Sequence, residues 1–161
     1  MFYASATPGV AIAEAVFHRL LFFADSAATP WPENAGEQTV FSVRFKTAAG
    51  LDLTQPPLDA DRARWEHRVD YAACQNLAEA AREAAIEVIR YGSARVSGGV
   101  NYALLVCRAF GVPQPVERQT WRVHLSASGA RAVCDDPVAR LAFDKDAFAS
   151  DPRIAALQWE R

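Results

Sequence analysis

The sequence has few cysteines and histidines and no long apolar run, and each shortage argues against a class of protein. Its three cysteines have no Cys-x-x-Cys spacing, so they predict small buried thiols of a reducing cytoplasm rather than disulfides. The three histidines are scattered without the paired spacing of zinc ligands, which argues against a metal site. No segment has the roughly 18 apolar residues that a membrane helix needs, and the first residues lack the features of a signal peptide.

An excess of charge is missing as well. The formal net charge of −2 leaves no basic surplus, which argues against nucleic acid as the main ligand. Apolar material is plentiful instead, because 51% of the 161 residues are hydrophobic, including nine phenylalanines and four tryptophans. A chain of this length can fold as one domain around a proper core. We therefore expect a single domain over residues 1–161.

Apolar periodicity and turn residues predict a mixture of helices and strands. A helix is expected from Pro8 to about Ala24, because Thr7 can cap it and proline fits the first helical position. The expected strands are 1–4, 39–45, 51–53, 86–91 and 101–107, with a hairpin of 116–126 and 131–136 around the turn at 127–129. The tail has a short apolar run, LAF at 141–143. Further helices are expected at 60–66, 71–85 and 144–149, and a loop at 26–37. These elements describe an α+β fold, a single mixed α/β domain.

Glu14 is the first candidate for chemistry. On a helical wheel Val10, Phe17 and Leu21 share one face, Glu14 falls within that face, and Arg19 lies roughly opposite. A carboxylate in an apolar stripe is costly unless something pairs with it or uses it. The alternative is an ordinary helix glutamate paired with the histidine one turn further on.

A second candidate group follows the expected strand 86–91. Ser93 lies where a loop begins, so its hydroxyl could bond a ribose or phosphate oxygen, although a turn serine needs no function. Arg90 and Arg95 flank it, and a guanidinium is a natural bidentate partner for a pyrophosphate, although surface arginines are common in this chain. The pair Gly98-Gly99 lacks the spacing of a dinucleotide-binding loop, so a Rossmann site is not supported.

Two motifs carry a family resemblance, YASATPGVAIAE at 3–14 and RYGSAR at 90–95. This pattern resembles the RES-domain family, bacterial toxins of toxin–antitoxin pairs named after a characteristic arginine, glutamate and serine. The resemblance continues through ERQTWRVHLSASGARAVCD to DPRIAAL and spans essentially the whole chain. It implies a fold related to the ADP-ribosyltransferase toxins and an attack on NAD.

The resemblance also assigns roles to residues. Glu14 matches the family's glutamate and Ser93 its serine, and Tyr3 matches an aromatic that lines the family's NAD cleft. Arg95 and Asn101 lie near the motif and are expected to bind NAD. The family's arginine lies in a segment before the tyrosine, whereas this sequence starts just before Tyr3, so the domain is expected to lack that N-terminal segment. We expect Tyr3, Glu14 and Ser93 to converge on one cleft.

The implied activity is cleavage of the nicotinamide–ribose bond of NAD, by hydrolysis or phosphorolysis. A carboxylate such as Glu14 would stabilise the oxocarbenium-like transition state, while Tyr3 would either stack on the substrate or belong to the core. Alternatives are ADP-ribosyl transfer to a protein, or an impaired pseudo-toxin that still binds its antitoxin. The implied partners are NAD as substrate and a helix-turn-helix antitoxin, with no metal, no direct nucleic acid and no membrane. A cytoplasmic location is expected, and a homodimer is left open.

Overall fold

In the computed structural model, which describes every residue from Met1 to Arg161, the first helix begins where the sequence marks it. α1 covers Pro8–Asp25, and the Thr7 hydroxyl accepts a hydrogen bond from the Val10 N–H at 3.3 Å. Proline is favourable at the first helical position because its missing N–H would have no partner there. The expected helix is confirmed, and it ends one residue beyond Ala24.

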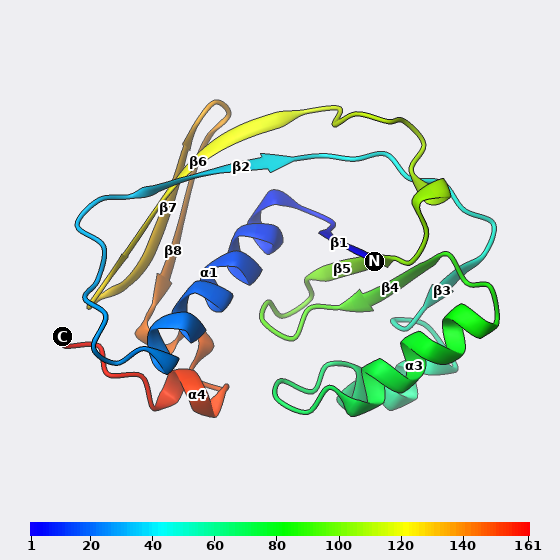
Figure 1. Cartoon of the computed structure of the whole chain (residues 1–161), viewed down its shortest axis with the longest axis horizontal. Coiled ribbons are helices and arrows are strands. Elements are labelled where there is room, and N and C mark those ends of the chain that lie inside the picture. Colours follow the sequence, from blue (N-terminus) through cyan, green and yellow to red (C-terminus); the bar gives the residue numbers. More distant parts are fainter. The chain divides into compact units, whose positions relative to one another are not determined.

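The chain forms two compact units, each with its own four-stranded sheet (Figure 1). The first unit comprises Met1–Ala11 and Val43–Val116, and the second comprises Ile12–Ser42 and Glu117–Arg161. The chain combines helices with mixed parallel and antiparallel strands, so the expected α+β class is confirmed. None of its helices is both long enough and apolar enough to cross a membrane.

The sheet of the first unit is built from four short strands. They cover Phe2–Ser5 (β1), Gly50–Asp52 (β3), Val88–Gly92 (β4) and Val100–Leu104 (β5). The order is β1-β5-β4-β3, in which β5 runs antiparallel to both β1 and β4, and β3 runs parallel to β4. All four strands were expected from the sequence, and only their ends differ.

Helices cover one face of this sheet. After a 3-10 turn at Leu58–Asp61 come the short helix α2 (Arg62–Trp65) and the longer α3 (Ala72–Glu83). They pack over a buried cluster made of Leu53, Ala81, Ile89 and Ala103. Neighbouring strand residues point to opposite faces, so Val88 and Leu104 form a second cluster on the other side, together with Ala109 of the 3-10 turn Cys107–Ala109.

The buried side of α3 differs from the expected one. The sequence suggested Ala73, Leu77, Ala80 and Ala84, but the structure buries Ala81 and exposes Ala80 and Ala84. Ala84 lies beyond the end of the helix, and the contact follows a row of every fourth residue through Ala73, Leu77 and Ala81. In an alanine-rich helix all sides look alike, so periodicity alone does not select the face.

The second unit holds an antiparallel sheet of β2 (Gly36–Phe41), β6 (Arg118–Ser126), β7 (Gly129–Asp135) and β8 (Val138–Asp144), in that order. The expected hairpin is confirmed, with Ser126 opposite Gly129. Gly129 has φ +119°, and a Cβ there would clash with the Phe143 carbonyl oxygen, so the position requires glycine.

Three further segments differ in the structure from what the sequence indicated. The strand expected at 39–45 is β2, which ends at Phe41 because that residue pairs with the first residue of β6. The short apolar run at 141–143 is part of a longer strand, β8, that begins at Val138. In place of the helix expected at 144–149 the chain forms a 3-10 turn, Lys145–Phe148, followed by the short helix α4, Pro152–Ala155.

α1 buries a face that is rotated from the expected one. Val10, Phe17 and Leu21 were expected at its centre with Glu14 among them, but Leu21 and Glu14 are only half-buried at the margin. The buried residues lie to the other side of Phe17 and comprise Val10, Ile12, Ala13, Val16, Phe17, Leu20 and Phe23. The Phe17 ring packs edge-on against Phe148 with a centroid distance of 5.7 Å, which identifies this side as the core side.

The solvent side of α1 is also not the expected one. Between its two terminal residues the exposed positions are His18 and Phe22, whereas Arg19 is half-buried. The Arg19 guanidinium lies against Gly36 of β2, where its nearest nitrogen would be 3.1 Å from an added Cβ. A long side chain can thus cover a neighbouring strand from a position that a helical wheel assigns to solvent.

A buried carboxylate organises the C-terminal end of the second unit. Asp151 is 1% exposed and caps α4 by accepting a hydrogen bond from the Arg153 N–H at 3.0 Å. The Arg153 guanidinium donates to both oxygens of the same carboxylate, at 3.0 and 2.8 Å. The guanidinium carbon also lies 6.0 Å from the centre of the Phe17 ring on α1.

Replacing this carboxylate should destabilise the protein. For Asp151→Ala we expect a loss of about 2–4 kcal/mol, because a helix cap and charge-assisted hydrogen bonds disappear together. The matched control is Asp135→Ala. The Asp135 side chain is 71% exposed and pairs with Arg122, so its removal should cost no more than about 1 kcal/mol of stability. Urea unfolding measures both variants, and equal losses would contradict the structural role of Asp151.

Candidate functional site

Four of the five expected site residues lie in the first unit. They come from β1, from β5 and from the connection between β4 and β5, here called the β4–β5 loop (residues 93–99): Tyr3, Ser93, Arg95 and Asn101. Glu14 lies on α1 in the second unit and is half-buried. The convergence of Glu14 with Tyr3 and Ser93 therefore stays a prediction.

Strand pairing places Asn101 in the middle of three strands. Asn101 lies opposite Ser5 of β1 on one side and opposite Tyr91 of β4 on the other. Its side chain is 5% exposed, and its Oδ1 accepts a hydrogen bond from the Ser5 hydroxyl at 2.7 Å. A buried amide is tolerated only when it is hydrogen-bonded, so this contact ties β1 to β5 at the end of the sheet where the β4–β5 loop leaves it.

Ser93 organises the β4–β5 loop. Its hydroxyl oxygen accepts hydrogen bonds from the N–H groups of Arg95 and Val96, both at 3.1 Å, and the residue is 5% exposed. Its own N–H donates to the Gly99 carbonyl at 2.8 Å, which closes the loop at its base. An added Cβ at Gly99 would lie 3.0 Å from the Val96 carbonyl oxygen, so the closed loop fits tightly around this glycine. The loop-building role that a turn serine can have is thus observed for Ser93.

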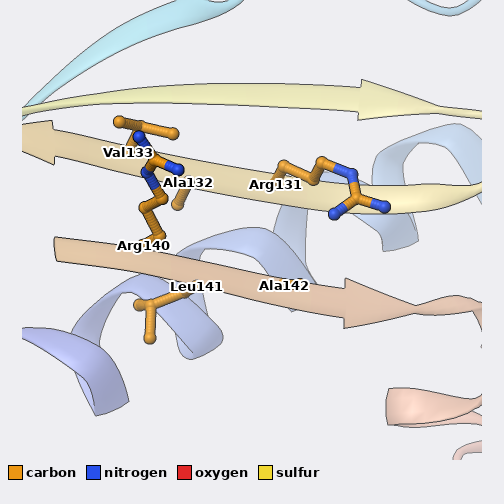
Figure 2. Close-up of a pocket in the computed structure, with 6 residues that line it drawn as sticks. All are labelled: Arg131, Ala132, Val133, Arg140, Leu141 and Ala142. Atoms are coloured by element: carbon orange, nitrogen blue, oxygen red, sulfur yellow. The ribbon is translucent and has the colours of Figure 1, made fainter.

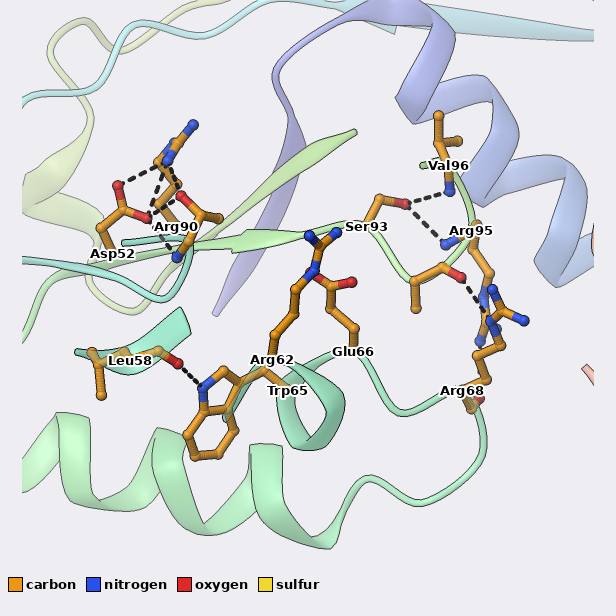
Figure 3. A network of polar contacts seen from close by, with 12 residues as sticks. Asp52, Leu58, Arg62, Trp65, Glu66, Arg68, Arg90, Ser93, Arg95 and Val96 are labelled. Atoms are coloured by element: carbon orange, nitrogen blue, oxygen red, sulfur yellow. Dashed lines mark hydrogen bonds and ion pairs between the residues drawn. The ribbon is translucent and has the colours of Figure 1, made fainter. Parts of the chain in front are cut away.

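Arg95 is held by a segment that the sequence did not mark (Figure 3). Its Nη2 donates to the Arg68 carbonyl at 3.1 Å and lies 3.4 Å from the Tyr71 hydroxyl. In return the Arg68 Nε donates to the Ala94 carbonyl at 3.1 Å. Nothing in the sequence pattern links these positions, because they lie in two polar loops more than twenty residues apart.

Tyr3 lies at the surface of the sheet. It pairs with Ala103 and is 66% exposed, so it does not belong to the core. By the alternation of strand residues it points to the same face as Ser5, which bonds Asn101. An exposed aromatic ring beside a polar, hydrogen-bonded end of a sheet is suited to stack on a planar ligand.

Arg90 joins two strands of the sheet, β4 and β3. Its Nη1 donates to both carboxylate oxygens of Asp52, at 3.1 and 2.8 Å, and to the Thr54 hydroxyl (Figure 3). Partial burial alone would raise the pKa of Asp52, but the hydrogen bonds from Thr54 and Arg90 outweigh it and hold this pKa below its ordinary value. Hydrogen bonds to Asp52 and Tyr102 raise the pKa of Arg90 in turn. The arginine of the β4–β5 loop is therefore Arg95.

Glu66 is a carboxylate at this end of the sheet that the sequence analysis missed. It accepts a hydrogen bond from the Arg62 Nε at 2.7 Å, and its side chain is 18% exposed. A Cβ added to Gly92, the last residue of β4, would coincide with the Glu66 carboxylate, so the two residues are in direct contact. A short helix with an acidic end near a glycine carries no sequence signal that would have identified it.

The second unit has a shallow hollow on β7 and β8 (Figure 2). It measures about 370 Å³ and is lined by Arg131, Ala132, Val133, Arg140, Leu141 and Ala142 of β7 and β8. None of the expected site residues lines it. The structure contains no group of three or more histidine, cysteine or acidic side chains placed to hold a metal ion.

The ion pair at Asp52 should make stability depend on pH. Because folding lowers its pKa below 3.8, the charged form contributes stability above pH 3.8, and this contribution is lost as the pH falls through the lowered value. Asp52→Asn should therefore be less stable than the wild type at neutral pH, and the gap should narrow below pH 3.8. Urea unfolding across this range tests it, with the exposed Asp59→Asn as control, and a gap that is constant with pH would refute it.

The comparisons with known proteins identify the family. The RES domain model matches residues 1–126, a range that includes all five expected site residues. A search of the curated proteins found no match. A match over more than two thirds of the chain, together with the α+β architecture described above, leads to one conclusion. The chain belongs to the RES-domain family.

Proposed function

We propose that this protein is an NAD-consuming enzyme that cleaves the bond between nicotinamide and ribose. Membership of the RES-domain family supports an NAD-directed activity. The observation that carries the proposal is the first unit's sheet, which carries Asn101 on β5, Ser93 and Arg95 in the β4–β5 loop, and the exposed ring of Tyr3 on β1. Hydroxyl, amide and guanidinium donors with one aromatic face are what a dinucleotide requires.

The reaction needs little from an acid catalyst. The C1′–N bond of the nicotinamide ribose breaks, the pair of electrons leaves with nicotinamide, and the pyridinium becomes a neutral leaving group. Water or phosphate then adds to C1′, and water loses a proton to solvent. The barrier lies in the positive charge that develops on the ribose, so a nearby carboxylate and well-placed dipoles supply the catalysis.

The residues divide into two kinds of role. Arg95 is suited to the pyrophosphate, because a guanidinium offers two parallel donors to phosphate oxygens. Tyr3 is suited to stacking, since its ring is exposed. Glu14 is the carboxylate that the family resemblance assigns to the ribose, and it is the residue we expect to act on the transition state.

The activity is tested by mixing the purified protein with NAD and measuring NAD loss and nicotinamide release. Buffers with and without phosphate separate phosphorolysis from hydrolysis, and NAD carrying a label on its ADP-ribose detects transfer to protein. The assay uses residues 1–161 and any longer in-frame product of the same gene, so that the family's arginine is represented. Nicotinamide release is expected, and its absence from both forms would contradict the proposal.

Glu14→Gln should reduce turnover by at least about a hundredfold. The substitution keeps the volume and one carbonyl but removes the charge, and one electrostatic stabiliser of a transition state contributes about 2.7–4 kcal/mol. NAD affinity should change much less, because the charge matters most once the oxocarbenium forms. Turnover and NAD binding are measured together with thermal melting.

The matched control is Glu83→Gln, which neutralises an exposed glutamate at the end of α3. It should retain full turnover. Wild-type turnover in Glu14→Gln would show that Glu14 is an ordinary helix residue, and loss of folding in that variant would make its role structural.

We also propose a helix-turn-helix antitoxin as partner, because the family resemblance implies one. Expression of the chain in bacteria should lower cellular NAD and arrest growth, and co-expression of a neighbouring antitoxin gene should restore both. Growth arrest without a fall in NAD would favour a different activity.

A further inference from the structure

The segment that joins α2 to α3 is hydrogen-bonded to the β4–β5 loop. This segment, residues 66–71, lies more than twenty residues before the loop in the sequence. Its Arg68 side chain donates through Nε to the Ala94 carbonyl at 3.1 Å. The Arg95 side chain donates through Nη2 to the Arg68 carbonyl at 3.1 Å. Each loop therefore binds the backbone of the other through an arginine, and Figure 3 draws the two side chains, Arg68 and Arg95.

Tyr71 completes this contact. Its hydroxyl donates to the Arg68 carbonyl at 2.9 Å and lies 3.4 Å from the Arg95 Nη2. The Arg68 carbonyl thus accepts from two side chains, one from each loop. With contacts to both the Arg68 carbonyl and the Tyr71 hydroxyl, the Arg95 guanidinium is fixed more closely than one hydrogen bond would fix it.

The segment is built to hold its own shape. The His67 Nδ1 accepts a hydrogen bond from the Asp70 N–H at 2.8 Å, and the Asp70 carboxylate accepts one from the Ala72 N–H at 2.9 Å. On its other side α2 is anchored to the sheet's helical layer, because the Trp65 indole donates to the Leu58 carbonyl at 2.9 Å. Arg68 therefore projects from a braced turn toward the loop.

We propose that Arg68 is a positioning residue, which holds the β4–β5 loop in the arrangement that binds NAD. The inference rests on the proposed function and deepens it. Ser93 and Arg95 flank the Ala94 carbonyl that Arg68 binds. The hydrogen bond from Arg68 therefore helps to fix the positions of both Ser93 and Arg95. Arg68 acts on substrate only through this loop, and it supplies no group to the reacting atoms.

The geometry explains why this position carries an arginine. The bond to Ala94 comes from Nε, which lies inside the side chain and is fixed by the planar guanidinium. A lysine ammonium is a rotatable point charge at the end of a longer flexible stem. Arg68→Lys should therefore recover part of the function at most.

The test compares Arg68→Ala, Arg68→Lys and Tyr71→Phe with the wild-type protein. The matched control is Arg64→Ala on the neighbouring helix, whose side chain is 63% exposed and pairs at 3.6 Å with an exposed Asp61. Three kinds of measurement are made on each: steady-state kinetics with NAD for KM and kcat, the melting temperature, and hydrogen exchange of the Arg95 and Val96 amides, which donate to the Ser93 hydroxyl.

For Arg68→Ala we expect KM to rise about tenfold with a smaller change in kcat, because the loss of one charge-assisted hydrogen bond to the loop acts on binding. Exchange of the two loop amides should accelerate. Arg68→Lys should lie between Arg68→Ala and the wild type, Tyr71→Phe should shift KM in the same direction, and Arg64→Ala should change nothing.

Three outcomes would overturn the inference. If hydrogen exchange of the loop amides is unchanged in Arg68→Ala, the hydrogen bond from Arg68 does not order the loop. If exchange is faster but KM for NAD is unchanged, the order of the loop does not affect NAD binding. If Arg68→Ala fails to fold, unchanged KM and exchange in both Arg68→Lys and Tyr71→Phe would overturn it. A wild-type protein that neither binds nor consumes NAD would instead refute the proposed function, while the exchange data would still show whether Arg68 orders the loop.

Discussion

The candidate site depends on one antiparallel arrangement, in which β5 lies between β1 and β4. This pairing sets Asn101 between Ser5 and Tyr91 and buries its amide, which then requires the bond from the Ser5 hydroxyl. The same pairing fixes both ends of the β4–β5 loop. Without it Tyr3 would have no fixed place relative to the loop, since β1 is held to the sheet by β5 alone.

Two arginines near this loop, Arg90 and Arg95, have different hydrogen-bond partners and therefore different roles. Arg90 alternates onto the face opposite Tyr91 and is engaged by Asp52, where it joins β4 to β3. Arg95 leaves the strand and is instead oriented by the Arg68 carbonyl. The side chains are chemically identical, so their different partners decide what each can contribute to a ligand.

The sequence predicted elements whose signals are local. Thr7 with Pro8 marked the start of α1, and the turn before Gly129 marked the hairpin. The position of Ser93 at a loop was predicted as well, because glycines follow a clear strand. The contact of Arg68 with Ala94 could not be predicted, since it joins polar turns through tertiary packing. The face of α1 around Glu14 was misjudged for a related reason: its alanines and large apolar residues extend around most of the helix, so only the packing of Phe17 selects the core side.

The most direct measurement is an NAD titration of isotope-labelled protein, followed through its backbone amide signals. We expect saturable shifts that concentrate in the β4–β5 loop, at Asn101 and in the segment 66–71. These residues form the polar end of the first unit's sheet and the segment that is hydrogen-bonded to its loop. Shifts confined to β7 and β8, which line the hollow of the second unit, would contradict this expectation, as would the absence of any saturable change.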